Sequence, residues 1–99
     1  MARGDAIAEL IVTVSGQSTD IRPTDDGDEW LLLMFAADHD NSNRLYGTDG
    51  TNTTQITSGY NTYQNFGMKL PITYSHYARH HASGAEKKCF IAGYVTKEA

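Results

Sequence analysis

Residues 29–37 read Glu-Trp-Leu-Leu-Leu-Met-Phe-Ala-Ala and form the most apolar stretch of the chain. Leucine, methionine and alanine favour helices and Asp28 could cap one, so a helix is the alternative to a strand here. The stretch is short, lies between turn-rich segments and has no polar face at helical spacing, and this favours a strand. A strand would place two sets of apolar side chains on opposite faces, Trp30, Leu32, Met34 and Ala36 on one and Leu31, Leu33 and Phe35 on the other.

A strand that is apolar on both faces has to be covered twice. In a small two-layer β domain, the outer face of each sheet is normally in contact with water. Either a second chain or a long loop of the same chain would have to cover the second face. We expect Trp30, Leu31, Leu33 and Phe35 to anchor both the core and a subunit interface.

Turn signals at intervals of about 8–12 residues divide the rest of the chain into short strands. In residues 9–14, Leu10, Val12 and Val14 share one face. In residues 66–72 the apolar side chains alternate with Lys69 and Pro71, which face outward, and residues 73–81 and 89–95 also read as strands. We count seven or eight strands in the 99 residues. The sequence therefore predicts a single all-β domain over residues 1–99, an antiparallel β-sandwich or jelly roll with its core at about 8–96.

Charge and hydropathy exclude several classes of protein. The formal net charge of −4 argues against nucleic acid as the partner, because phosphate binding needs a basic surface. Acidic residues are concentrated in the first half, since residues 1–50 hold ten Asp or Glu and three Lys or Arg, against two and five in residues 51–99. This asymmetry favours either self-association between unlike surfaces or simply solvated loops.

Neither a membrane span nor a secretion signal is expected. No apolar run approaches the roughly 20 residues that a membrane span needs, and residues 1–5 are not apolar. The single cysteine, Cys89, forbids an internal disulfide, and this fits synthesis in a reducing cytoplasm. Lys87 and Lys88 could lower the pKa of its thiol, but its place at the start of an apolar strand favours a buried structural role.

No catalytic motif is present, so an enzyme is not expected: the sequence lacks a nucleophile elbow, a phosphate-binding Walker loop, an HExxH pair and paired CxxC motifs. His76, His80 and His81 form the most suggestive cluster. On a strand, however, His76 and His80 lie about 13 Å apart, too far to share a metal ion. They read as ordinary half-exposed histidines, with a pH-sensitive interface contact as the alternative.

Two acidic segments resemble metal loops only weakly. Residues 38–42 place oxygen-bearing side chains at alternate positions, as a calcium loop does, but Asn43 replaces the turn glycine and no flanking helices are evident. Residues 25–28 read as a solvated turn. We therefore expect no metal ion and no cofactor.

Tyr60 and Tyr63 lie among amide side chains in a segment with almost no aliphatic residue. Tyrosine supplies contact area with little loss of entropy, and the amides supply adaptable hydrogen bonds. This loop could bind a carbohydrate or a protein, or be buried in an oligomer of the chain itself.

Three short motifs resemble those of small virion proteins of tailed bacteriophages. An acidic, glycine-containing turn precedes a tryptophan strand in residues 24–30, an Asp-Gly-Thr-Asn turn follows at residues 49–52, and residues 70–79 read Leu-Pro-Ile-Thr-Tyr-Ser-His-Tyr-Ala-Arg. In the family, Asn-Ser usually precedes the tyrosine of this last motif, where the chain has Tyr74-Ser75-His76. The resemblance spans roughly residues 8–96.

The resemblance implies a single β-sandwich or jelly-roll domain that decorates a capsid as a cement protein, often as a homotrimer, or forms part of a fibre or tail. Its partners would then be other copies of itself and the major capsid protein, and its location the capsid surface of a virion assembled in the host cytoplasm. We expect Tyr60, Tyr63, Tyr74, His76 and Tyr77 to make partner-facing contacts. The alternative function is a receptor- or carbohydrate-binding module, such as a tail-fibre knob, that uses residues 60–65.

Overall fold

The computed structural model describes residues 2–37, 42–58 and 66–99, with the backbone alone for residues 66 and 67. These residues form strands and no helix, so residues 29–37 are a strand as predicted. The eight strands are β1 (Ala6–Thr13), β2 (Ser18–Ile21), β3 (Glu29–Ala37), β4 (Asn43–Thr48), β5 (Thr53–Ser58), β6 (Phe66–Thr73), β7 (Tyr77–Ala82) and β8 (Lys87–Lys97). Nothing in this part of the chain is a helix long and apolar enough to cross a membrane.

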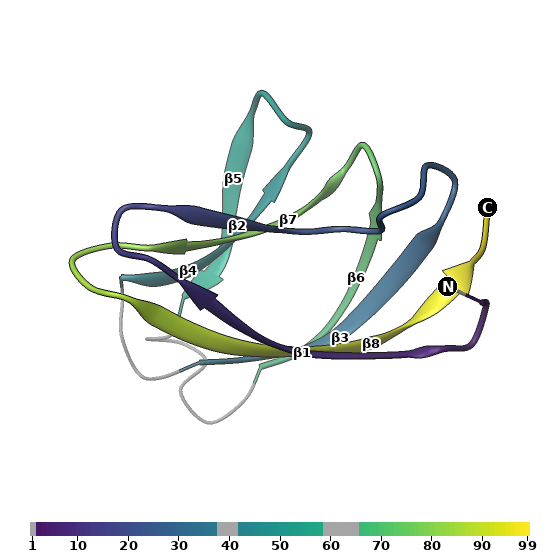
Figure 1. Cartoon of the computed structure of the whole chain (residues 1–99), viewed down its shortest axis with the longest axis horizontal. Coiled ribbons are helices and arrows are strands. Elements are labelled where there is room, and N and C mark those ends of the chain that lie inside the picture. Colours follow the sequence, from purple (N-terminus) through teal and green to yellow (C-terminus); the bar gives the residue numbers. More distant parts are fainter. Residues whose placement is uncertain (1, 38–41, 59–65) are drawn as a thin grey trace.

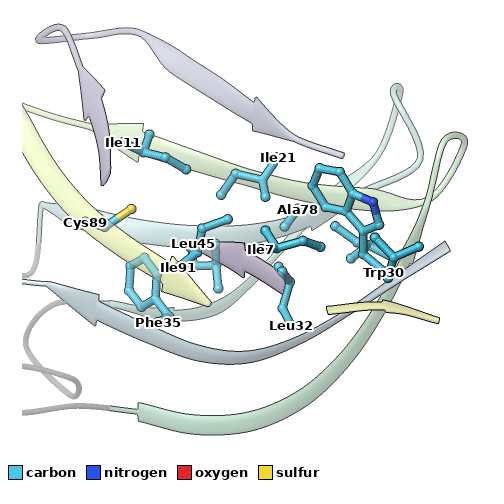
Figure 2. Packing of buried hydrophobic residues seen from close by; sticks show 12 residues of the cluster. Ile7, Ile11, Ile21, Trp30, Leu32, Phe35, Leu45, Ala78, Cys89 and Ile91 are labelled. Atoms are coloured by element: carbon cyan, nitrogen blue, oxygen red, sulfur yellow. The ribbon is translucent and has the colours of Figure 1, made fainter. Parts of the chain in front are cut away.

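The strands form two antiparallel four-stranded sheets that pack face to face, which confirms the predicted β-sandwich (Figure 1). The first sheet has the order β1-β8-β3-β6 and the second has the order β2-β7-β4-β5. β1 and β2 are consecutive in sequence but belong to different sheets, so the chain crosses from one layer to the other between them. The core lies between the layers, as Figure 2 shows for Ile11, Leu32, Phe35 and Ile91.

A β-bulge in β3 decides which of its side chains face the core. The pairing register shifts between Leu32 and Met34 against both neighbouring strands. Because the bulge adds one residue, Trp30, Leu32 and Phe35 all point inward and are buried. The prediction that Phe35 lies opposite Trp30 and Leu32, and that Met34 and Ala36 share a face with these two, was therefore wrong.

β8 accommodates the irregular β3 through a glycine. A Cβ atom built on Gly93 would lie 2.9 Å from the backbone Cα of Leu32 and even closer to the carbonyl of Leu31. No side chain fits at this position unless the two strands move apart, so Gly93 permits the close approach of β3 and β8.

The structure shows which face of β1 is buried. Ile7, Ile11 and Thr13 are buried, whereas Leu10 and Val12 are exposed. The period-two alternation was predicted correctly, and the side that carries Thr13 faces the core. The predicted strand over residues 73–81 is also interrupted, because residues 74–76 form the turn between β6 and β7.

Candidate functional site

The outer face of the first sheet is apolar and exposed. We define the apolar face by five side chains whose exposed fractions are large: Leu10 (65%), Val12 (45%), Leu33 (38%), Phe90 (38%) and Tyr94 (40%). They come from β1, β3 and β8, the three adjacent strands of that sheet. A patch of exposed apolar side chains of this kind marks an interaction surface in a soluble protein.

The strand register makes this face continuous. Three successive cross-strand rows carry only alanine, leucine, methionine and aromatic side chains: Ala6–Tyr94–Leu31, Ala8–Ala92–Met34 and Leu10–Phe90–Ala36. Charges lie at both ends of these rows: Lys88 pairs with Val12 in the row after Leu10, and Glu29 pairs with Lys97 beyond the row of Leu31. The apolar face therefore has a basic side chain at one border.

The predicted anchor residues are divided between the core and this face. Trp30 and Phe35 are 6% and 0% exposed, so these two side chains belong to the core and are not available to a partner. Leu31 is half-buried and Leu33 is exposed, and both lie on the outer side of β3. The sequence identified β3 as apolar on both faces, but missed Leu10 and Phe90 as members of the exposed set.

The outer face of the second sheet is polar and aromatic. Arg79 forms an ion pair with Asp20 (Nε to Oδ1, 2.8 Å), and His81 is hydrogen-bonded through Nδ1 to the hydroxyl of Ser18 (2.8 Å). The ring of Tyr46 meets the ring of His81 edge-on, with 6.2 Å between the centroids. This face is suited to hydrogen bonding and ionic contacts, in contrast to the apolar face.

The predicted partner-facing residues near β7 lie at one end of this polar face. Tyr74 and His76 are exposed in the turn between β6 and β7. Tyr77, the first residue of β7, is buried although it is on the outer side, because arginine side chains cover its ring. Tyr60 and Tyr63 lie outside the described residues, as do residues 38–41 of the predicted calcium-like loop.

His80 lies between the two sheets in a buried chain of hydrogen bonds. Its Nε2 lies 2.5 Å from Oδ1 of Asn43, an acceptor, so Nε2 carries the proton. Its Nδ1 then accepts from the hydroxyl of Thr13 (2.7 Å), which in turn is bonded to the hydroxyl of Thr19 (2.7 Å). The amide of Asn43 donates to the carbonyl of Lys88 at 2.9 Å and closes the link to the first sheet.

This arrangement keeps His80 neutral. Burial, together with the smaller effect of the neighbouring His81, lowers the pKa of His80 to about 4. Since both ring nitrogens are occupied by hydrogen bonds, His80 links the sheets and has no free nitrogen for a ligand. The three histidines are separated: His76 is in a turn, His80 faces inward and His81 faces outward.

A pocket of about 360 Å³ lies between the β4–β5 turn, β6 and the β6–β7 turn. Asp49 lines it, but the carboxylate Oδ1 accepts hydrogen bonds from the backbone N–H groups of Asn52 (2.7 Å) and Thr51 (2.9 Å), which lower the pKa of Asp49. His76 also lines the pocket, and its Nδ1 is bonded to the hydroxyl of Ser75 (3.1 Å). The polar groups of the pocket therefore hold its two turns in shape.

Metal-binding and thiol chemistry are not supported by the part of the chain that the structure describes. In that part, no three His, Cys, Asp or Glu side chains are close enough together to hold a metal ion. Cys89 is 2% exposed, and burial raises the pKa of its thiol to about 12. Burial therefore decides the pKa of this thiol, and the neighbouring Lys87 and Lys88 do not lower it. Cys89 is a core residue, as its position at the start of the strand predicted.

Comparison of the chain with protein-family models and with curated protein sequences gave no match. The functional argument therefore rests on the two outer faces of the sandwich.

Proposed function

We propose that this protein is a non-enzymatic virion structural protein, a capsid decoration protein that stabilises the shell by associating with itself and with capsid subunits. The observation that carries the proposal is the apolar face, because an isolated sandwich normally presents polar side chains on its outer faces. The motifs that resemble phage virion proteins supply the biological setting. A decoration protein of this kind stabilises the assembled shell by mass action, since it binds the assembled state alone.

The dimensions of the apolar face suit a second copy of the same chain as its first occupant. Its three rows, at a spacing of about 7 Å along the strands, extend across strands about 4.8 Å apart. With side chains included, this gives a flat apolar area on the order of 400 Å², about half of the roughly 800 Å² that each partner buries in a stable interface. The apolar face would be the centre of such an interface, and Lys88 would lie on its polar rim.

Native mass spectrometry at micromolar concentration tests self-association directly. We expect the wild-type protein to be an oligomer, and specifically a trimer. Leu10→Asp and Phe90→Asp each place a carboxylate within the apolar face and should convert the oligomer to folded monomers. Gln55→Asp, an exposed position on β5 of the other sheet, is the matched control and should leave the oligomer intact. A monomeric wild-type protein would contradict this part of the proposal.

Capsid decoration is tested with shells prepared with and without the protein. The decorated shells should resist heat and low salt better than the bare shells, and Leu10→Asp should remove the added resistance. If bare and decorated shells open at the same temperature, the decoration role fails even if the protein forms oligomers.

A further inference from the structure

The second sheet holds an arginine clamped between two tyrosines. The guanidinium carbon of Arg22, which follows the end of β2, lies 4.5 Å from the ring centroid of Tyr74 and 4.4 Å from that of Tyr77. Nη1 of Arg22 also donates a hydrogen bond to the carbonyl of Tyr74 (3.0 Å). We call these three side chains the Arg22 clamp. Contacts with two rings restrict the positions that the guanidinium can take.

Arg22 differs from Arg79, its neighbour on the same face, in having no carboxylate partner. Arg79 is neutralised by Asp20 at 2.8 Å. Among the described residues, no acidic side chain lies within ion-pairing distance of Arg22. Stacking occupies the two faces of a guanidinium and leaves its edge, with five N–H donors, for hydrogen bonds in the plane. Because one donor reaches Tyr74, the others are left for a ligand or water.

The surroundings of the clamp have the composition of a protein-binding hot spot. Arginine and tyrosine are among the residues enriched at the energetic centres of interfaces. The strand pairs place Tyr46, Arg79 and Asp20 in one row, and Arg44 and His81 in the next. Among the described residues, this face thus carries Arg22, Arg44 and Arg79, with Asp20 paired to Arg79 and Asp49 in the adjoining pocket, although the whole chain carries a net charge of −4. An acidic partner would be attracted to Arg22 on this face.

We propose that the Arg22 clamp binds a carboxylate side chain in an acidic segment of a partner protein. The planar edge of Arg22 would donate two parallel hydrogen bonds to the two carboxylate oxygens, the geometry for which a guanidinium is shaped. Tyr74, which is 38% exposed, would contact the apolar part of the acidic side chain. The site lies on the sheet opposite the apolar face, so this inference does not depend on the proposed capsid role.

The probe is a fluorescently labelled peptide that contains four glutamates, titrated with the full chain at low salt. Its fluorescence anisotropy reports binding, and the same peptide with glutamines in place of the glutamates should not bind. Arg22→Lys keeps the charge but removes the planar edge, so we expect at least tenfold weaker binding. Arg3→Lys, at an exposed position near the N-terminus, is the matched control and should bind like the wild type.

A second pair of variants tests the stacking. Tyr74→Phe keeps the aromatic ring and should bind within twofold of the wild type, whereas Tyr74→Leu should weaken binding severalfold. Thermal unfolding of each variant shows whether the fold is intact, so that a loss of binding in a folded Arg22→Lys protein reports on the site itself.

Three results would overturn the proposal. Equal binding by Arg22→Lys and wild type would show that charge alone attracts the peptide. Competition by inorganic phosphate at concentrations where acetate has no effect would show that the site prefers a tetrahedral anion. Tighter binding of a uronic-acid oligosaccharide than of the glutamate peptide would identify an acidic sugar, and not a protein, as the ligand.

Discussion

Acidification should destabilise this fold through His80. The folded protein holds this ring neutral between Thr13 and Asn43, and burial lowers its pKa from 6.5 to about 4. Below pH 6.5 the unfolded chain takes up a proton at this position and the folded protein does not, so the free energy of unfolding falls as the pH is lowered. The difference between the two pKa values corresponds to about 3 kcal/mol, fully present above pH 6.5 and lost by about pH 4.

Urea unfolding at intervals between pH 7.5 and pH 4 measures this loss, and His80→Gln separates it from other effects. Glutamine can still form hydrogen bonds but does not titrate, so the variant should be less stable at pH 7 by about 1–2 kcal/mol and should lose the His80 part of the pH dependence. His76→Gln, at an exposed histidine of the β6–β7 turn, is the matched control and should keep the wild-type slope.

The reasoning would be refuted if His80→Gln lost stability between pH 6.5 and pH 4 as steeply as the wild type does. Carboxylates would then be the cause. Asp49 would not be among them, because the backbone N–H groups of Asn52 and Thr51 lower its pKa. Its contribution to stability is lost at lower pH than that of His80, because a carboxylate with a lowered pKa becomes protonated only there.

Three further predictions concern the core. Gly93→Ala should destabilise the protein by about 1–3 kcal/mol in urea unfolding, because β3 and β8 must separate to make room for the Cβ atom. Gly47→Ala is the control and should have little effect, because its Cβ atom would meet Ile56 at an ordinary 3.5 Å. Equal effects of the two substitutions would refute the close approach of β3 and β8 at Gly93. Phe35→Ala should cost about 3–5 kcal/mol, and a cost below 1 kcal/mol would contradict the inward position that the bulge gives it. Cys89 should react with a thiol reagent only as fast as the protein opens, and rapid labelling under native conditions would contradict its burial.

The strands could be predicted from the sequence because alternation and turn residues are local signals. The direction in which a strand faces could not always be predicted. In β1, Leu10 and Val12 alternate with Ile7 and Ile11, so both faces are apolar and the pattern does not show which one is buried. Glu9 lies on the same face as Ile7 and Ile11, so this side of the strand carries a charged residue although it is the side that faces the core.

Two further differences arose from irregular backbone geometry. The bulge between Leu32 and Met34 turns Phe35 inward, but no residue type in a uniformly apolar strand marks a bulge. The turn at residues 74–76 contains neither glycine nor proline. It is held instead by Thr73, whose backbone N–H donates to the carbonyl of His76 (2.7 Å) and whose hydroxyl accepts from the backbone N–H of His76 (3.1 Å). Side-chain and backbone bonds of this kind replace the usual turn residues and leave no clear signal in the sequence.

Glu9 also restricts how the first sheet can associate. β1 and β6 are the edge strands of that sheet. Glu9 brings an exposed charge to the inward side of β1, and Pro71 interrupts the donor pattern of β6; both features discourage pairing of edges with another chain. With both edges protected, the apolar face is the part of the first sheet left for contact between copies. Self-association should therefore use the apolar face and not extend the sheet from strand to strand.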